Sequence, residues 1–196
     1  MEPSLEELRA LVPPRGPAEP RIAPGRRADI GALNWIVAAV AGRVAGTGPM
    51  NIFTTLGRHR SLFRRWLIFA GALMPGGKLP RADSELVILR VAVNTGAAYE
   101  WHQHVLLGQK AGLPADRIAA VVDGPTAGGW TPRQEALLHC CDELHAVQLL
   151  SDETWAELRA AGLSDRDLVE LLMLVGAYEG LAMALNGLGV QVERPR

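Results

Sequence analysis

Apolar residues recur at helical spacing over almost the whole chain, and this pattern constrains the fold more than any other feature. Leu33, Ile36, Val37, Val40 and Val44 form one such stripe. Leu62, Phe63, Trp66, Leu67, Phe69 and Ala70 form another. Spacings of three and four residues place side chains on one face of a helix, whereas strands alternate every second residue. Since almost no segment alternates in this way, the sequence predicts an all-α protein.

Glycine, proline and capping residues divide this pattern into about eight helices. The loops contain Gly46-Thr-Gly-Pro49, Met74-Pro-Gly-Gly77 and Asn94-Thr-Gly96, because glycine tolerates left-handed geometry and proline cannot continue a helix. Ser4, Thr131, Ser151 and Ser164 are expected N-caps, and Asp83 and Ser84 are expected to cap the helix after Pro80. The helices after Asn94 are expected near 97–111, 115–122, 152–161 and 165–185, with a further helix beginning at Thr131-Pro132.

The first 25 residues differ from the rest, because six of the thirteen prolines lie in them. Proline removes a backbone donor and fixes φ, so residues 1–25 are predicted to form an extended arm, with room for a short helix at 4–11. Residues 26–196 are predicted to form a single helical domain, since a chain of 196 residues is the size of one ordinary domain.

Composition argues against several classes of function. The net charge is −1, so no overall field would draw the chain to nucleic acid or to anionic lipid. The apolar stretches 30–42 and 66–77 are shorter than the roughly 20 residues of a membrane-spanning helix. The N-terminus lacks the order of a secretory signal, and the only two cysteines, Cys140 and Cys141, are adjacent and support no disulfide framework. We therefore expect a cytoplasmic protein with no membrane or nucleic-acid partner.

An acid and an imidazole lie together in the segment Ala97-Ala-Tyr-Glu-Trp-His-Gln-His104. Glu100 and His104 are four residues apart and share a helix face. A buried carboxyl and a nearby imidazole are suited to general acid–base chemistry, although a surface Glu–His pair has the same spacing. Tyr99 and Trp101 are candidate substrate contacts as well as ordinary core aromatics. His102 is expected to be exposed on another face from His104, so the two histidines do not suggest a metal site.

These residues resemble the carboxymuconolactone decarboxylase family, within the alkylhydroperoxidase-D-like superfamily. The resemblance rests on Tyr-Glu-Trp-x-x-His at 99–104, on Leu79 to Arg90, on Leu168 to Val192 with Val175-Gly-Ala-Tyr178 and Asn186, and extends over about 51–192. It implies an alkylhydroperoxidase-D-like helical bundle and a site formed by Glu85, Glu100 and His104. Redox relatives carry Cys-x-x-Cys where this chain has Ala97 and Glu100, and the thiols at 140–141 cannot replace that pair. A peroxidase role, which requires both sulfurs, is therefore not expected.

The resemblance implies a lyase without cofactor or metal that decarboxylates a small unsaturated lactone or a related carbonyl acid. Either Glu100 or Glu85 would supply a proton while His104 stabilises an oxygen. Arg58, His59 and Arg90 are candidate anchors for an anionic substrate, or structural ion-pair residues. Two alternatives stay open: a cofactor-free isomerase, cyclase or dehydratase using the same site, and a non-catalytic protein that binds small molecules or assembles. Family members typically form trimers or hexamers, so a homo-oligomer is expected, with the N-terminal arm available to wrap a neighbouring subunit.

Overall fold

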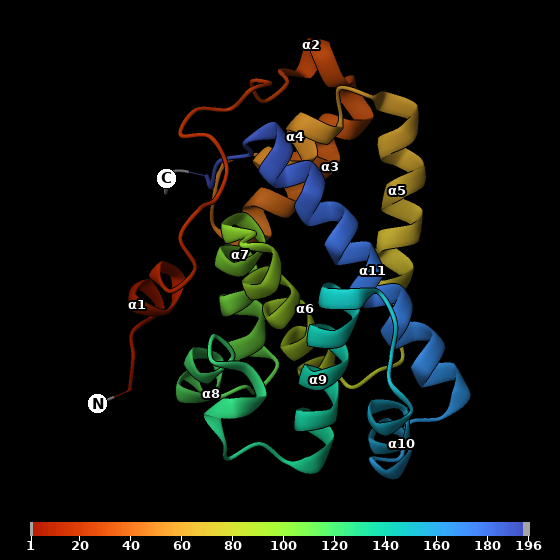
Figure 1. Ribbon diagram of the computed structural model, residues 1–196. Coiled ribbons are helices and arrows are strands. Elements are labelled where there is room, and N and C mark those ends of the chain that lie inside the picture. The colour runs from red at the N-terminus through yellow and green to blue at the C-terminus, as the bar shows by residue number, and fades with distance from the viewer. Residues whose placement is uncertain (1, 194–196) are drawn as a thin grey trace. The chain divides into compact units, whose positions relative to one another are not determined.

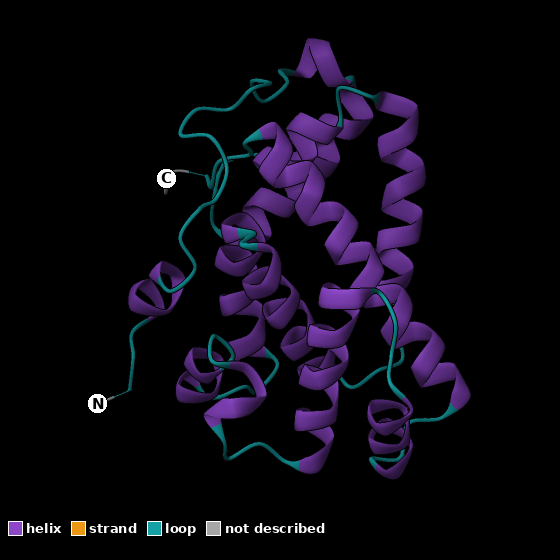
Figure 2. Cartoon of the chain, viewed as in Figure 1, coloured by secondary structure: helices purple, strands orange, loops and turns teal. Residues whose placement is uncertain are grey.

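The computed structural model describes residues 2–193, and within this range every regular element is a helix (Figure 1, Figure 2). The elements are α1 (Leu5–Ala10), α2 (Arg27–Ile30), α3 (Ala32–Ala45), α4 (Asn51–Leu56), α5 (Arg60–Leu73), α6 (Arg81–Thr95), α7 (Ala98–Lys110), α8 (Ala115–Ala120), the 3-10 helix η1 (Gly124–Ala127), α9 (Pro132–Val147), α10 (Asp152–Ala160) and α11 (Asp165–Leu188). The predicted all-α class is confirmed. The eleven α-helices in this range exceed the predicted eight because elements as short as α2 and α4 leave too few turns for an apolar period to show.

Most of the predicted helix starts are confirmed by their caps. The Ser4 and Thr131 hydroxyls accept hydrogen bonds from the amides of Glu7 and Gln134, and both sites are complete capping boxes. One prediction is wrong: Asp83 and Ser84 do not cap α6, because the helix already begins at Arg81 with Pro80 as its N-cap residue. Proline supplies the non-helical backbone there, and the Asp83 carboxylate instead forms an ion pair with Arg133 at 2.7 Å.

The chain divides into two compact units, one formed by residues 1–15 and 77–184 and the other by residues 16–76 and 185–196. The first 25 residues are thus shared between the units, and they are not wholly extended, since α1 lies among them. The single domain predicted for 26–196 and the contact of the arm with a neighbouring subunit stay predictions.

The first unit is built around α6, which contacts both α7 and α9. Leu86, Val87, Ile88 and Leu89 are buried on successive faces of α6. Burial on every face shows that this part of α6 lies in the interior of the unit. Gly96 ends α6 in the left-handed conformation with φ of 61°, and a Cβ there would collide with the side chain of Arg15. The turn between α6 and α7 therefore requires glycine.

The N-terminal helix α1 is fastened to α7 in this unit. Leu8 is fully buried, and the indole Nε1 of Trp101 donates a hydrogen bond of 2.7 Å to the Leu8 carbonyl oxygen. Arg9 Nε donates to the His102 carbonyl oxygen at 3.3 Å. His102 is consequently half-buried rather than exposed as predicted. Burial, reinforced by the positive charge of Arg9, lowers the pKa of His102 to about 4.

The second unit contains α2 to α5 and the end of α11. Phe53, Phe63 and Trp66 form an aromatic cluster with ring centroids 5.8 to 6.3 Å apart. The arm joins the unit through the Arg21 amide, which donates to the Leu188 carbonyl oxygen at 2.9 Å. Several large apolar side chains of α3 and α5 remain exposed, namely Leu33, Ile36, Val40, Val44, Leu62 and Ile68.

The longest helix, α11, is also rich in apolar residues. It is the one helix within residues 2–193 that is long and apolar enough to cross a membrane, although about a third of its most apolar stretch is buried in the protein. Uninterrupted apolar runs do not reveal α11 in the sequence, because Glu179 lies within it. Core helices of soluble proteins have the same character, and the structure is compatible with a soluble protein. A cytoplasmic location stays a prediction.

Candidate functional site

The buried polar cluster of the first unit lies where α6 faces α7. Glu85 on α6 is fully buried, and its Oε2 is 2.7 Å from the Nδ1 of His104 on α7. Its Oε1 is 2.8 Å from a guanidinium nitrogen of Arg81, one turn earlier on α6. Glu85 therefore bridges a guanidinium and an imidazole. Because Nδ1 of His104 is engaged by Glu85, the Nε2 atom is the one available to a substrate.

Glu100 is the second buried acid of the cluster, and its surroundings are very different. The residue is 3% exposed, and neither carboxyl oxygen has a hydrogen-bond partner among the described residues. Burial raises the pKa of Glu100 well above its usual range, and the negative charge of Glu179 raises it further. A carboxyl in these surroundings holds its proton at pH values at which an exposed glutamate is ionised.

Tyr178 on α11 completes the cluster. Its ring meets the His104 imidazole edge to face, with centroids 5.3 Å apart and planes at 83°. Burial, followed by the charges of Glu100 and Glu85, raises the pKa of Tyr178, so its hydroxyl stays protonated. Val175-Gly-Ala-Tyr178 is part of the family resemblance, but the sequence alone does not indicate a role for Tyr178. The residue that follows, Glu179, bonds to His145 of α9, with Oε1 2.8 Å from Nδ1.

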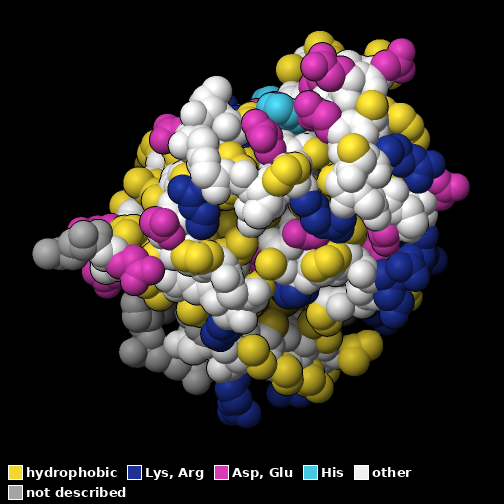
Figure 3. Space-filling model, turned by 90° about the horizontal axis from the view of Figure 1, so that it is seen from below, with side chains coloured by type: hydrophobic (Ala, Val, Ile, Leu, Met, Phe, Trp, Pro, Cys, Tyr) yellow, Lys and Arg dark blue, Asp and Glu magenta, His cyan; other side chains and the backbone are white. Residues whose placement is uncertain are grey.

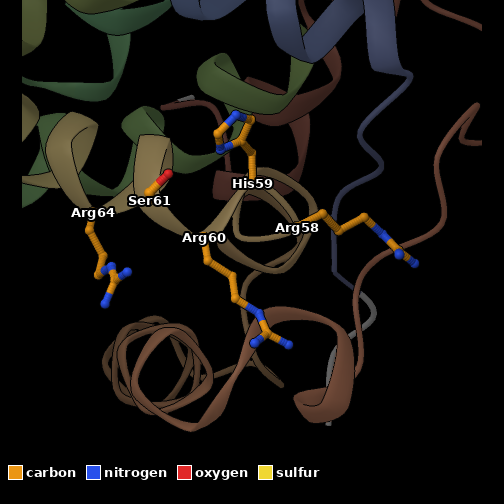
Figure 4. Close-up of a pocket in the computed structure, with 5 residues that line it drawn as sticks. All are labelled: Arg58, His59, Arg60, Ser61 and Arg64. Carbon is orange, nitrogen blue, oxygen red and sulfur yellow. The ribbon is translucent and has the colours of Figure 1, made fainter.

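The predicted substrate-binding residues fall into two groups. Tyr99 and Trp101 lie on α7 beside the cluster, where both are buried and Trp101 is bonded to α1. Arg58 and His59 lie in the second unit, between α4 and α5, so the structure does not assign them to the cluster. With Arg60, Ser61 and Arg64 they line an open surface depression (Figure 4). In the figure, the arginine side chains point in different directions instead of converging on one point. The binding roles of all four residues stay predictions.

The arginines that were candidate anion anchors make structural contacts. Arg58 Nε donates to the Ala23 carbonyl oxygen at 2.9 Å and so holds the N-terminal arm. Arg90 forms a two-pronged contact with Asp142, at 2.6 and 2.8 Å. Its remaining nitrogen donates to the carbonyl oxygens of Val121 and Val122. This geometry favours the structural interpretation of Arg90.

The two cysteines are free and fully buried. Burial, followed by the charge of Glu143, raises the pKa of Cys140 to about 12. Burial also raises the pKa of Cys141 well above the ordinary thiol range. Thiols in such surroundings are poor nucleophiles. Across residues 2–193, no three side chains of the His, Cys, Asp or Glu type form a group able to hold a metal ion.

The cluster thus combines three chemical capabilities. Glu100 offers a buried proton, His104 offers an oriented nitrogen, and Tyr178 offers a neutral hydroxyl on a ring that packs against His104. Such a group of side chains suits reactions in which a proton is delivered to carbon while negative charge develops on an oxygen.

Comparison with known proteins places this cluster in a family context. Residues 60–143, which include α6, α7 and the three predicted site residues, match the model of the carboxymuconolactone decarboxylase family. The resemblance found in the sequence is thereby confirmed, over a shorter range than the 51–192 first inferred. A search of functionally curated proteins gave no match.

Solved structures share the fold over most of their length. An alkylhydroperoxidase AhpD core protein from Ralstonia eutropha JMP134 is 20% identical, with a TM-score of 0.76 over 89% of this chain and 92% of its own. An uncharacterized peroxidase-related protein from Silicibacter sp. TM1040 is 12% identical, with a TM-score of 0.77 over 91% and 96%. The debrominase Bmp8 in complex with 2,3,4-tribromopyrrole is 14% identical, with a TM-score of 0.73 over 91% and 94%. At these identities the likeness concerns the fold, and it confirms the predicted alkylhydroperoxidase-D-like class.

Proposed function

From the match to the carboxymuconolactone decarboxylase family over residues 60–143, we propose that the protein is a lyase that needs no cofactor and decarboxylates a small unsaturated lactone or a related carbonyl acid. The family and the fold support an enzyme of decarboxylase-like or peroxidase-related type. The buried, raised-pKa thiols argue for the former, because peroxidase chemistry of this superfamily runs through an accessible cysteine pair.

The observation that carries the proposal is the contrast between the two acids of the cluster. Glu85 is compensated by Arg81 and His104, so it orients the imidazole. Glu100 has no hydrogen-bond partner within residues 2–193 and is the acid that keeps its proton. Of the two candidate proton donors left open by the sequence, the structure favours Glu100.

The reaction follows from these roles. As the C–C bond to the substrate carboxylate breaks, CO2 leaves and the electron pair moves through the conjugated double bond onto the carbonyl oxygen. His104, with a proton on each ring nitrogen, donates Nδ1–H to Glu85 and Nε2–H to that oxygen, and so stabilises the developing dienolate. Glu100 then transfers its proton to carbon, which yields the neutral enol-lactone. Each turnover consumes one substrate carboxylate and one proton, and it forms one CO2 and one C–H bond. Glu100 must therefore regain a proton from solvent after each turnover.

The test is a direct assay. Purified protein is mixed with 4-carboxymuconolactone, the substrate after which the family is named, and CO2 release is followed. We expect turnover in the native protein and loss of turnover in His104→Ala. The control is His139→Ala, since His139 makes a similar contact with Glu157 on the surface, at 3.0 Å. Absence of turnover in the native protein would discard this substrate, and equal turnover in the two variants would discard the role of His104.

The two other functions that the sequence leaves open predict different outcomes in the same assay. An isomerase, cyclase or dehydratase would change the carbon skeleton or the water content of a carbonyl compound without releasing CO2. A binding protein would raise its melting temperature with a ligand that is recovered unaltered. Mass spectrometry of the recovered small molecule separates all three. The assembly of the protein as a trimer or hexamer is part of the proposal, and light scattering that gives a mass of 21.1 kDa would contradict it.

A further inference from the structure

The small net charge of the chain is the sum of two large charges of opposite sign. Residues 16–76, the main segment of the second unit, contain eight arginines and two acidic residues. Residues 77–184, the main segment of the first unit, contain eight basic and fifteen acidic residues. These basic and acidic segments therefore carry formal charges of +6 and −7, respectively. Charge asymmetry between parts of one chain is typical of a protein that binds a charged partner.

The positive charge of the basic segment lies on the surface and is little compensated. All eight of its arginines are exposed. Of its two acids, Asp29 is already engaged by Arg26 and Arg58, at 3.7 and 4.0 Å. Within the described part of the chain, the ion pairs of this segment do not reach Arg64 or Arg65, which are adjacent on α5. These two charges are therefore available to an outside partner.

Large apolar side chains are exposed around these two arginines. Leu62, Ile68 and Phe69 of α5 are 58%, 76% and 40% exposed. Each lies three or four residues from Arg64 or Arg65, so the five side chains share one side of the helix. We call this surface the α5 face, and Arg64 also lines the open depression in Figure 4. Exposed apolar side chains beside arginines are typical of a protein interface.

The acidic segment offers few carboxylates that such a face could bind. Most of them are engaged by arginines, histidines, hydroxyls or backbone amides. Within residues 2–193, the exposed acids of this segment whose carboxylates have neither an ion pair nor a hydrogen bond are Asp123, Glu135, Asp152 and Glu153. A partner for the α5 face is therefore to be sought near one of these four residues.

Asp152 and Glu153, at the start of α10, are the two that adjoin large exposed apolar side chains in the sequence. Val147 at the end of α9 is 68% exposed, Leu149 is 70% exposed and Trp155 is 41% exposed. We call these five residues the α10 edge. It has the opposite charge to the α5 face and, like that face, three large apolar side chains, so the two surfaces are complementary in chemistry.

A second copy of the chain is the partner that carries such an edge. An anionic membrane would attract the basic segment, but it would repel the acidic segment of the same chain. The α10 edge of another copy presents carboxylates and apolar side chains together, and so it matches both components of the α5 face.

We propose that the α5 face of one copy binds the α10 edge of the next copy, head to tail. Because each copy carries both surfaces, the same contact repeats from copy to copy, and contacts of this type build rings when the rotation closes. The inference rests on the homo-oligomer included in the proposed function and names the surfaces that form it. It requires nothing of the decarboxylation.

The experiment measures the mass of the assembly by light scattering over a dilution series. Arg64→Glu combined with Arg65→Glu should raise the dissociation constant by about 100-fold or more, because like charges would then face one another across the contact. Asp152→Lys combined with Glu153→Lys should raise it to a similar degree. The chain that carries all four substitutions should assemble again, since the charges are exchanged but remain complementary.

Two matched controls change the same charge elsewhere. Arg26→Glu combined with Arg27→Glu reverses another adjacent, exposed pair of the basic segment. Asp123→Lys combined with Glu135→Lys reverses the two exposed acids that lie outside the α10 edge. Both controls should keep the mass of the native assembly. Circular dichroism checks the fold of every variant, and recovery of assembly by the fourfold variant separates a specific contact from damage to the fold.

The other partners give different results. If only the arginine variant dissociates, the α5 face binds its own counterpart on a second copy, and the head-to-tail contact is refuted. If the native protein has a mass of 21.1 kDa and sediments with vesicles that contain phosphatidylserine, the α5 face binds a membrane, and both the oligomer and the contact are refuted.

The contact and the proposed function also fail separately. An assembly whose mass is unchanged by either charge reversal keeps the homo-oligomer and refutes the head-to-tail contact. A protein that shows the expected loss and recovery of assembly but releases no CO2 keeps the contact and refutes the decarboxylase.

Discussion

The two buried acids of the cluster, Glu85 and Glu100, show how the same side chain serves opposite purposes in one unit. Both are almost completely removed from water. Glu85 has a guanidinium on one oxygen and an imidazole on the other, at 2.8 and 2.7 Å. Glu100 has burial and a like charge, and both raise its pKa. The partners of a buried carboxyl, more than its depth of burial, therefore decide whether it orients a neighbour or keeps a proton.

The largest effect expected from this comparison is on turnover in Glu100→Gln. The amide keeps the size of the acid but has no acidic proton to give, so kcat should fall by about 100-fold or more. KM should change little, because the lost interaction is one made in the transition state. Steady-state kinetics of CO2 release measure both constants. A variant that retains its kcat would show that Glu100 is not the donor.

Glu85→Gln tests the other side of the comparison and should have a smaller effect on turnover. Loss of an outer partner of a functional histidine typically costs about 10- to 100-fold in activity. The change should also destabilise the protein by about 1–3 kcal/mol, since it leaves a buried polar group without its charged partner. Urea unfolding measures the stability. If Glu85→Gln reduces kcat more than Glu100→Gln does, the roles assigned to the two acids are wrong.

Glu100→Gln should also stabilise the protein at neutral pH, whereas Glu85→Gln should destabilise it. The folded state holds a proton on Glu100 that the unfolded chain releases above the ordinary value of 4.5. The free energy of unfolding therefore declines as the pH rises past that value, towards the raised pKa. The glutamine side chain of the variant does not titrate, so the variant lacks this decline. We expect a Tm at pH 7 that is higher by about 2–4 °C, the range that corresponds to 1 kcal/mol in a chain of this size. An equal or lower Tm, measured by calorimetry, would contradict the assignment.

The residue after Glu100 provides a structural control for these variants. Trp101→Phe removes the indole hydrogen bond to the Leu8 carbonyl oxygen and leaves that oxygen with the Leu11 amide as its donor. The expected loss is about 1 kcal/mol, with the pH dependence of turnover unchanged. If this variant instead shifts the pH profile, changes in the packing of α7 alone would account for effects attributed to the acid.

The smallest effect concerns His102, on the side of α7 that faces α1. Its folded pKa of about 4 lies below the ordinary value of 6.5, so the unfolded chain binds a proton in this window that the folded state does not. Stability should therefore fall as the pH drops from about 6.5 to about 4. His102→Gln should flatten this part of the Tm profile, by less than the change due to Glu100 at pH 7, because His102 is only half-buried. A profile unchanged by the substitution would show that His102 does not contribute.

Local pattern predicts the fold well here, because helix faces and caps are encoded within a few residues. The starts at Ser4 and Thr131 and the Glu100–His104 spacing are of this kind. Contacts between distant segments escape such reasoning. Nothing local in the sequence distinguishes Arg90 bonded to Asp142 from an arginine free to bind substrate, or indicates that Tyr178 lies 74 residues away from His104 in sequence yet against its ring.

The exposed apolar side chains of the surface could not be predicted from the sequence pattern either. Large apolar side chains such as Val169, Met173 and Met183 of α11 stay exposed, and Figure 3 shows apolar side chains among charged ones on the face that it presents. Periodicity identifies a stripe, but it does not distinguish a stripe that faces the chain's own core from one that remains outside. The predicted homo-oligomer would provide cover for such residues, and it stays a prediction.

The hydrogen bond from Trp101 to Leu8 has a practical consequence for anyone who engineers this protein. A truncation of this protein would naturally remove the proline-rich N-terminal segment, at the boundary near residue 25 that the sequence predicts. Such trimming would delete a fully buried leucine and strip the indole next to Glu100 of its acceptor. Affinity tags and fusion partners are therefore safer when they extend the N-terminus than when they replace it, and a shortened protein that loses activity should not be taken as evidence about the chemistry of the site.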